Sequence, residues 1–220
     1  MGLSVGLDSA RTACLESVAG FIDAVKSLSE YELLGASRCH GWCRLDVVVH
    51  VIAGWQEMLG GMVSPVDAAP SVDAATYWPA FAGEYGTDDP VPVLMSQRRR
   101  TAAYARPSSA TAQLRDVAAM VRRGVASHRD RSYLWQGHVF TAGDFLAVWA
   151  VENVVHQLDL VSGVPAPADA LALARATIEA LVGRPLPDGW SDEDAVLIGT
   201  GRAAVPAEAV DLAALLPALG

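Results

Sequence analysis

The chain has 220 residues, 52% of them hydrophobic, and its 16 basic and 25 acidic residues give a formal net charge of −9. The acidic balance argues against nucleic acid as the main partner, and no apolar run approaches the roughly 18 residues that span a membrane. No basic patch precedes an apolar core at the N-terminus, and the three cysteines fit a reducing compartment, so we expect a soluble cytoplasmic protein. Lys26 is the only lysine, a bias typical of GC-rich bacterial genomes.

Apolar residues recur at helical spacing through most of the chain. Asp8 or Ser9 could cap a first helix of about twenty residues, and a second helix starts near Cys43, although cysteine is a poor cap. No segment alternates strictly enough to require a strand, but 133–135 could be extended and 195–199 could be a strand. Further helices are predicted at 73–83, 91–104, 108–127, 141–163, 168–182, 192–199 and 206–215.

A long excursion rich in proline, alanine, aspartate and glycine separates the early helices from the later ones, at 62–92. It carries Tyr77, Trp78 and Phe81. Excursions of this length commonly line a binding site, so we expect a wall of a pocket here.

The segment at 141–161, TAGDFLAVWAVENVVHQLDLV, places charged residues inside an almost unbroken apolar run. Thr141 and Asp144 form a capping box at its start. Glu152 and His156 are four residues apart, so their side chains lie on one face of the helix. Burying a carboxylate without a counter-charge is costly, and a bound divalent metal would compensate Glu152.

His50, on the second helix, is the candidate for the third ligand of such a metal. It shares a helix face with the small residues Ala53 and Gly54, which leave room beside the imidazole. Three protein ligands and one open position are typical of catalytic zinc sites. The ion would lower the pKa of a coordinated water or thiol.

A simpler interpretation of the pair is a weak contact between Glu152 and His156 on a partly exposed helix flank. Asn153 and Gln157 indicate a solvent-facing strip on this helix, and Glu152 lies only about 100° from it. Spacing alone leaves both interpretations open.

Three runs of sequence are similar to one known family. SRCHGWCRLDVVVHVIAG at 37–54 resembles the entry segment of the mycothiol-dependent maleylpyruvate isomerase family, a branch of the DinB-like metal-binding bundles. VENVVHQLDL at 151–160 resembles that family's segment of metal ligands, and WSDEDAVLIGTGR at 190–202 resembles its closing stretch. The three runs occur in the order that the family has.

The helical pattern indicates an all-α bundle with a short, mostly helical C-terminal extension, and the resemblance implies an up-down-down-up four-helix bundle. We therefore expect a metal-binding bundle at 1–164 and an extension packed on it at 165–220. His50, Glu152 and His156 would hold a divalent metal, usually zinc, and Asp159 would orient a ligand through a hydrogen bond. A low-molecular-weight thiol, mycothiol in actinobacteria, would be the cosubstrate.

The function that this implies is a thiol-dependent transferase or isomerase, in which the metal activates a thiolate for attack on an electrophilic substrate. The alternative is a non-catalytic helical bundle that binds a metal or ligand. The sequence identifies neither the electrophile nor the thiol, and it allows an oligomer.

The chain departs from the family pattern at several positions. His40 replaces the usual proline and Cys43 the usual serine or threonine cap, while Cys39 is expected to be structural. The tail after Trp190 is too short for the family's separate substrate domain, so the maleylpyruvate reaction itself is not expected to carry over. Arg202 could meet an anionic substrate or be a surface arginine in a turn.

Overall fold

The computed structural model describes residues 1–86 and 89–219 and is mostly helical. The predicted excursion at 62–92 and the predicted extension at 165–220 include the residues outside these ranges, 87–88 and 220. In chain order the elements are α1 (Leu7–Lys26), α2 (Glu30–Leu33), α3 (Arg44–Met62), β1 (Pro65–Val66), α4 (Tyr77–Tyr85), α5 (Val91–Ala102), α6 (Pro107–Ser127), β2 (Ser132–Trp135), β3 (His138–Thr141), α7 (Ala142–Asp159), α8 (Ala168–Val182), α9 (Asp192–Gly199) and the 3₁₀-helix η1 (Ala207–Leu212).

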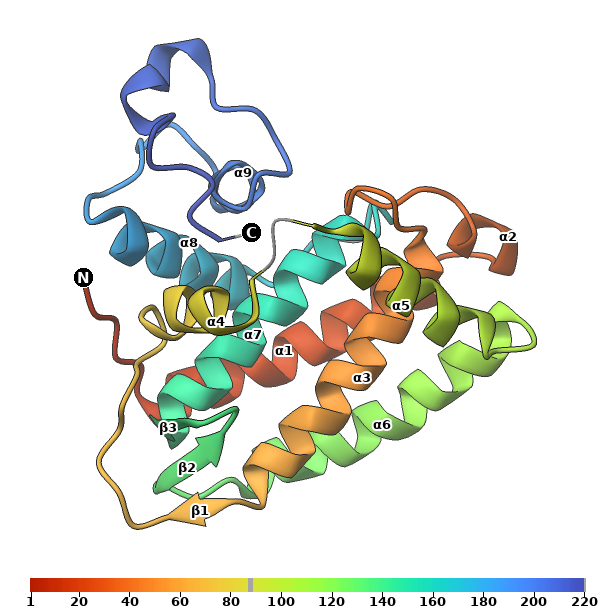
Figure 1. Ribbon diagram of the computed structural model, residues 1–220, viewed down its shortest axis with the longest axis horizontal. Helices are drawn as coiled ribbons and strands as arrows, with labels where there is room; N and C mark the ends of the chain where they lie inside the picture. The colour runs from red at the N-terminus through yellow and green to blue at the C-terminus, as the bar shows by residue number, and fades with distance from the viewer. Residues whose placement is uncertain (87–88, 220) are drawn as a thin grey trace.

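The long helices α1, α3, α6 and α7 form a bundle (Figure 1). Helices α1 and α7 run in one direction and α3 and α6 in the other, with α1 packed on α7 and α3 on α6. The predicted all-α, up-down-down-up bundle with a helical extension is therefore confirmed. Pro107 opens α6 at its first turn, where its missing N–H costs no hydrogen bond, and separates α6 from α5.

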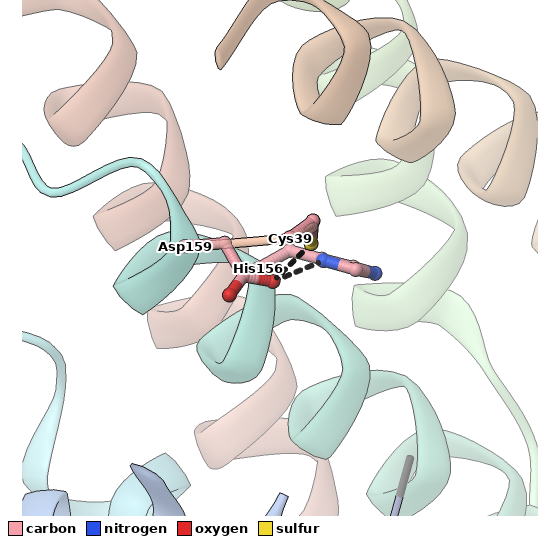
Figure 2. Close-up of side chains that lie close together, drawn as sticks. All are labelled: Cys39, His156 and Asp159. Carbon is pink, nitrogen blue, oxygen red and sulfur yellow. Dashed lines mark hydrogen bonds and ion pairs between the residues drawn. The ribbon is translucent and has the colours of Figure 1, made fainter. Parts of the chain in front are cut away.

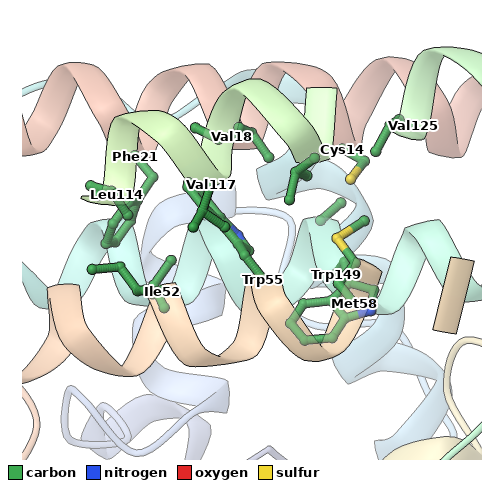
Figure 3. Packing of buried hydrophobic residues seen from close by; sticks show 14 of the residues in the cluster. Cys14, Val18, Phe21, Ile52, Trp55, Met58, Leu114, Val117, Val125 and Trp149 are labelled. Carbon is green, nitrogen blue, oxygen red and sulfur yellow. The ribbon is translucent and has the colours of Figure 1, made fainter. Parts of the chain in front are cut away.

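The core lies between these helices, where apolar side chains from all four interdigitate (Figure 3). Phe21 of α1 and Trp55 of α3 are fully buried and meet edge to face, with ring centroids 5.8 Å apart. Leu114 of α6 is also fully buried. Burying one such side chain contributes about 1.5–3 kcal/mol, so packing fixes the scaffold that carries the charged residues of α7.

Helix α7 is the most enclosed element, and Glu152 is its only residue that is not buried. The predicted solvent-facing strip is wrong, because Asn153 and Gln157 are only 1% and 2% exposed. Helix α1 covers this strip: Ser17 accepts a hydrogen bond from Asn153, and a side chain at Gly20 would collide with Gln157. Glu152 is thus the residue of α7 that faces open space.

The N-terminus of α7 begins where the capping residues predicted. The Thr141 hydroxyl accepts a hydrogen bond from the Asp144 backbone N–H at 3.0 Å and donates to the Asp144 carboxylate at 2.8 Å. The other Asp144 oxygen accepts from the Val5 backbone N–H at 2.8 Å. The capping carboxylate therefore also fastens the N-terminal segment to α7.

Two other helix starts differ from expectation. Helix α1 begins at Leu7 after Gly6, with no side-chain cap, so the predicted Asp8 or Ser9 cap is wrong. At α3 the Asp46 carboxylate accepts from the Cys43 backbone N–H at 2.9 Å. The acid three residues on therefore compensates for a cysteine in the capping position.

A three-stranded antiparallel sheet, in the order β1-β2-β3, was not predicted beyond the extended residues at 133–135. Gln136 and Gly137, with φ of 47° and 75°, form the tight turn between β2 and β3. This hairpin turns Trp135 toward α7, where its ring centroid lies 5.0 Å from that of Trp149. Residues 195–199 belong to α9, and the predicted alternative of a strand there is wrong.

The C-terminal extension packs on the bundle through α8, which contacts α7 and α1. Val151, Val154 and Leu158 of α7 belong to a second apolar cluster together with α8 and α9. Among the described residues, no helix is both long and apolar enough to cross a membrane.

Candidate metal centre and adjoining cavity

His50, Glu152 and His156 come together at one end of the bundle, where the second turn of α3 faces the last turns of α7. Glu152 Oε1 lies 3.3 Å from His50 Nε2 and 3.1 Å from His156 Nε2. The three candidate ligand atoms all lie within 4.8 Å of one another. Sequence spacing and the resemblance had singled out these three residues, and the fold brings their side chains into one group.

The arrangement of donors and acceptors in this group calls for a cation. The Asp159 carboxylate accepts from His156 Nδ1 at 2.9 Å, so a neutral His156 would point the lone pair of Nε2 at Glu152. Two acceptors only 3.1 Å apart repel each other unless a proton or a metal ion lies between them. Two imidazole nitrogens and one carboxylate oxygen are a donor set that zinc accepts, so the residues fit a divalent metal.

The charges of the metal-free cluster follow from the same geometry. Burial disfavours the charged form of Glu152, but His156 and the hydrogen bonds from both histidines outweigh it and hold the pKa of Glu152 well below its ordinary value. Burial likewise opposes the charging of His156, but the Glu152 and Asp159 carboxylates raise the pKa of His156 well above its ordinary value. Without a metal, a proton on His156 supplies the positive charge.

Asp159, the last residue of α7, is fully buried and joins His156 to two other segments. Figure 2 shows Cys39, from the connection after α2, and His156 both bonded to it, with the Cys39 sulfur 3.0 Å from Oδ2. The Arg202 guanidinium donates to both carboxylate oxygens, at 2.8 and 3.0 Å. Burial opposes the charge, but the bonds from His156 and Arg202 prevail and lower the pKa of Asp159.

Arg202 is a partly buried partner of Asp159, with 17% of its side chain exposed. It follows α9, and its Nη1 also donates to the Thr200 carbonyl at 3.0 Å. The predicted alternative of a surface arginine in a turn is therefore wrong. The sequence could not reveal this contact, because 43 residues separate Arg202 from Asp159.

Cys39, His156 and Asp159 form a second group whose ligand atoms lie within 4.8 Å of one another. Arg202 already occupies both oxygens of Asp159, and its Nη2 lies 3.9 Å from the Cys39 sulfur. A metal ion there would sit beside a guanidinium, and like charges repel. The group of His50, Glu152 and His156 is therefore the better candidate for a metal site.

A cavity of about 410 Å³ adjoins the candidate metal site, with His50 and Glu152 in its wall. The excursion lines it through α4, as the sequence predicted, and Ala53 and Gly54 of α3 lie beside His50. The lining residues that the sequence did not indicate include Glu57, Arg100 and Gln136. Its aromatic lining consists of Tyr77, Trp78, Phe81, Tyr85, Trp135 and Trp149.

The fold and this donor group define the class as a DinB-like helical bundle with a candidate three-ligand metal site. The family described as the mycothiol maleylpyruvate isomerase N-terminal domain matches residues 14–161, and the chain belongs to this family. The match includes His50, Glu152, His156 and Asp159 and ends before Arg202.

Two solved structures share the fold. One is the mycothiol-dependent maleylpyruvate isomerase, with a TM-score of 0.57 and 16% identity over 81% of this chain and 70% of that one. The other is a histidine-to-alanine mutant of the same enzyme, with a TM-score of 0.56 and 15% identity over the same shares. No curated protein matches the chain by sequence.

Proposed function

We propose that the protein is an isomerase or transferase that depends on a divalent metal, zinc in the first instance, and on a mycothiol-type thiol. The observation that carries the proposal is the convergence of His50 Nε2, Glu152 Oε1 and His156 Nε2 within 4.8 Å beside a cavity. Membership of a family named for a mycothiol-dependent isomerase supports the thiol and the reaction class.

His50, Glu152 and His156 would hold the ion. A divalent metal there would lower the pKa of a thiol that reaches it and stabilise the thiolate at neutral pH. His50 and Glu152 have 34% and 29% of their side chains exposed and line the cavity, whereas His156 has only 9% exposed. The accessible side of the donor group therefore faces the space where a thiol and an electrophile would meet.

Asp159 and Arg202 would act as positioning residues. Asp159 holds His156 Nδ1, which leaves Nε2 free to bind a metal, and the Arg202 guanidinium keeps Asp159 charged and fixed. Such partners of a ligating histidine tune its orientation and basicity. The predicted division into a bundle at 1–164 and an extension belongs to the same proposal, with the extension supplying Arg202.

The cosubstrate thiol loses its proton to solvent, and its sulfur forms a bond to an electrophilic carbon in the cavity. As this bond forms, either a leaving group departs with its electron pair, or the π pair of a C=C bond moves onto a conjugated carbonyl and returns when the S–C bond breaks. A transferase releases the product with the S–C bond intact. An isomerase breaks that bond again after the substrate has rearranged, so the thiol is regenerated.

Metal content is the first test. Protein purified without added metal should carry about one divalent ion per chain, and His50→Ala should lose it. His40→Ala is the matched control, because His40 is an exposed loop histidine outside the donor group. Wild-type metal content in His50→Ala would overturn the assigned ligands.

Turnover is the second test. With mycothiol and 1-chloro-2,4-dinitrobenzene, the thiolate should displace chloride, so that the S–C bond forms as the C–Cl bond breaks. We expect this adduct only with metal present, and Glu152→Gln should react no faster than the uncatalysed mixture. A metal-loaded protein that forms no adduct with this electrophile or with maleylpyruvate would favour the non-catalytic bundle.

A further inference from the structure

We infer that the cavity beside the candidate metal centre takes a planar, largely apolar electrophile with at most one anionic group, in preference to a dicarboxylate. That the ligand is an electrophile rests on the proposed function. The shape of the cavity and the charges of its wall outside the metal-ligand group supply the rest.

The aromatic wall is assembled before any ligand arrives. Tyr77 lies at its centre, with its ring centroid 5.4 Å from that of Trp78, 5.7 Å from that of Phe81 and 5.3 Å from that of Trp135. Trp135 in turn lies 5.0 Å from Trp149 of α7. Offset and edge contacts of this kind favour a further flat ring, because the faces and edges of aromatic groups attract each other.

Three polar side chains of the wall are hydrogen-bonded to one another. The Tyr77 hydroxyl donates to Gln136 Oε1 at 2.9 Å, and Gln136 Nε2 donates to Glu57 Oε2 at 3.2 Å. This series of hydrogen bonds ends on the Glu57 carboxylate, which repels anions. These three residues therefore offer a second carboxylate of a substrate no positive charge.

Arg100 of α5 is the only cationic side chain among the described residues that line the cavity, where Glu57 and Glu152 are acidic. Arg100 is exposed, and it forms no salt bridge with any residue that the structure describes. Arg100 is thus available to one anionic group at the edge of the cavity. A dicarboxylate such as maleylpyruvate would leave its second charge among aromatic rings and beside Glu57, which is unfavourable.

The volume agrees with one small organic molecule. About 410 Å³ lies within the usual range of ligand pockets, roughly 300–1,000 Å³.

The test measures binding of three unreactive probes by quenching of tryptophan fluorescence and by calorimetry, with metal-loaded and with metal-free protein. The probes are 1,3-dinitrobenzene (neutral), 3-nitrobenzoate (one charge) and maleate (two charges). With metal-free protein we expect saturable binding of both nitroaromatic probes, and maleate binding weaker by about tenfold or more. The metal-loaded protein shows how much of any maleate binding is due to the ion. Maleate binding as tight as that of 3-nitrobenzoate would overturn the inference.

Two pairs of variants locate the binding. Phe81→Ala should weaken 1,3-dinitrobenzene by about two- to tenfold, whereas Tyr31→Ala, which removes a 86% exposed aromatic residue of α2, should not. Tyr85→Ala, at a 53% exposed cavity position, serves if Phe81→Ala does not fold. Unchanged affinity in the folded cavity variant would overturn the inference.

Arg100→Gln should weaken 3-nitrobenzoate by about two- to fivefold and leave 1,3-dinitrobenzene unchanged. Arg99→Gln, which changes the neighbouring arginine outside the cavity, should affect neither. Equal effects of the two arginine variants would overturn the role of Arg100. Probe binding needs neither metal nor thiol. If the probes do not bind, but wild-type protein carries metal and His50→Ala loses it, this inference is refuted while the proposed metal site stands.

Discussion

Asn153 and Glu152 are adjacent residues of α7, and each belongs to a polar cluster. The two clusters differ in whether their polar groups are satisfied within the protein. Asn153 accepts from the Trp55 indole at 2.8 Å and donates to the Ser17 hydroxyl at 3.0 Å, deep in the core and without net charge. Glu152 instead faces two histidine nitrogens, is partly exposed and borders a cavity. The first cluster is satisfied within the chain, whereas the second requires a cation. A cluster whose polar groups are all satisfied, which we call closed, stabilises the fold. A cluster that still requires a cation, which we call open, can bind a ligand.

The largest effect is expected where the open cluster is anchored. Asp159→Asn removes the charge that compensates the partly buried Arg202, so the free energy of unfolding should fall by at most about 3–5 kcal/mol. Urea unfolding in the presence of a chelator measures this. Asp211→Asn, which breaks an exposed pair with Arg184, should cost less than about 1 kcal/mol. Equal losses in the two variants would show that Asp159 is not a buried anchor.

His128 sharpens the comparison, because it is buried like the closed cluster but its Nε2 has no partner among the described residues. Burial, with a smaller contribution from Arg11, lowers the pKa of His128 from 6.5 to about 4. His128 therefore becomes protonated near pH 6.5 in the unfolded chain but only near pH 4 in the folded protein. Stability present above pH 6.5 is lost as the pH falls through this window, by roughly 3 kcal/mol in total.

His128→Asn should lack this part of the pH dependence. The measurement is the difference in unfolding free energy between wild type and variant at several pH values from 7 to 4. The difference should change steadily below about pH 6.5. A constant difference would mean that His128 titrates alike in both states.

The smallest effect separates the two clusters directly. Asn153→Ala leaves the Trp55 N–H unsatisfied and should lower the unfolding free energy by about 1–3 kcal/mol while metal content stays at the wild-type level. Its neighbour, Glu152→Gln, should lose the metal. If Asn153→Ala also lost the metal while folded, the two clusters would be one functional unit.

The sequence singled out the residues of the candidate site because their pattern is local or has a resemblance behind it. Glu152 and His156 lie one helical turn apart, and the spacing on one helix face needs no tertiary information. His50 followed from its segment, and the capping residues Thr141 and Asp144 marked the start of α7 correctly.

What the sequence could not show depends on long-range packing. Asn153 and Gln157 look like a solvent-facing strip, but α1 covers them, and periodicity cannot say which helix will lie on a polar face. The contact of Arg202 with Asp159 and the turn at Gln136 that aims Trp135 at the cavity are equally non-local. Aromatic residues in the excursion indicated a wall, but not which site it would border.

The pairing of Asp159 with Arg202 also sets an order of events during synthesis. Arg202 is synthesised 43 residues after Asp159, so the four long helices of the bundle are all translated before it. Because proteins fold from the N-terminal side as they are made, the bundle can assemble while this buried carboxylate still lacks its guanidinium. The nascent chain can thus bring His50, Glu152 and His156 together early, but His156 is locked in place only after α9 has been translated.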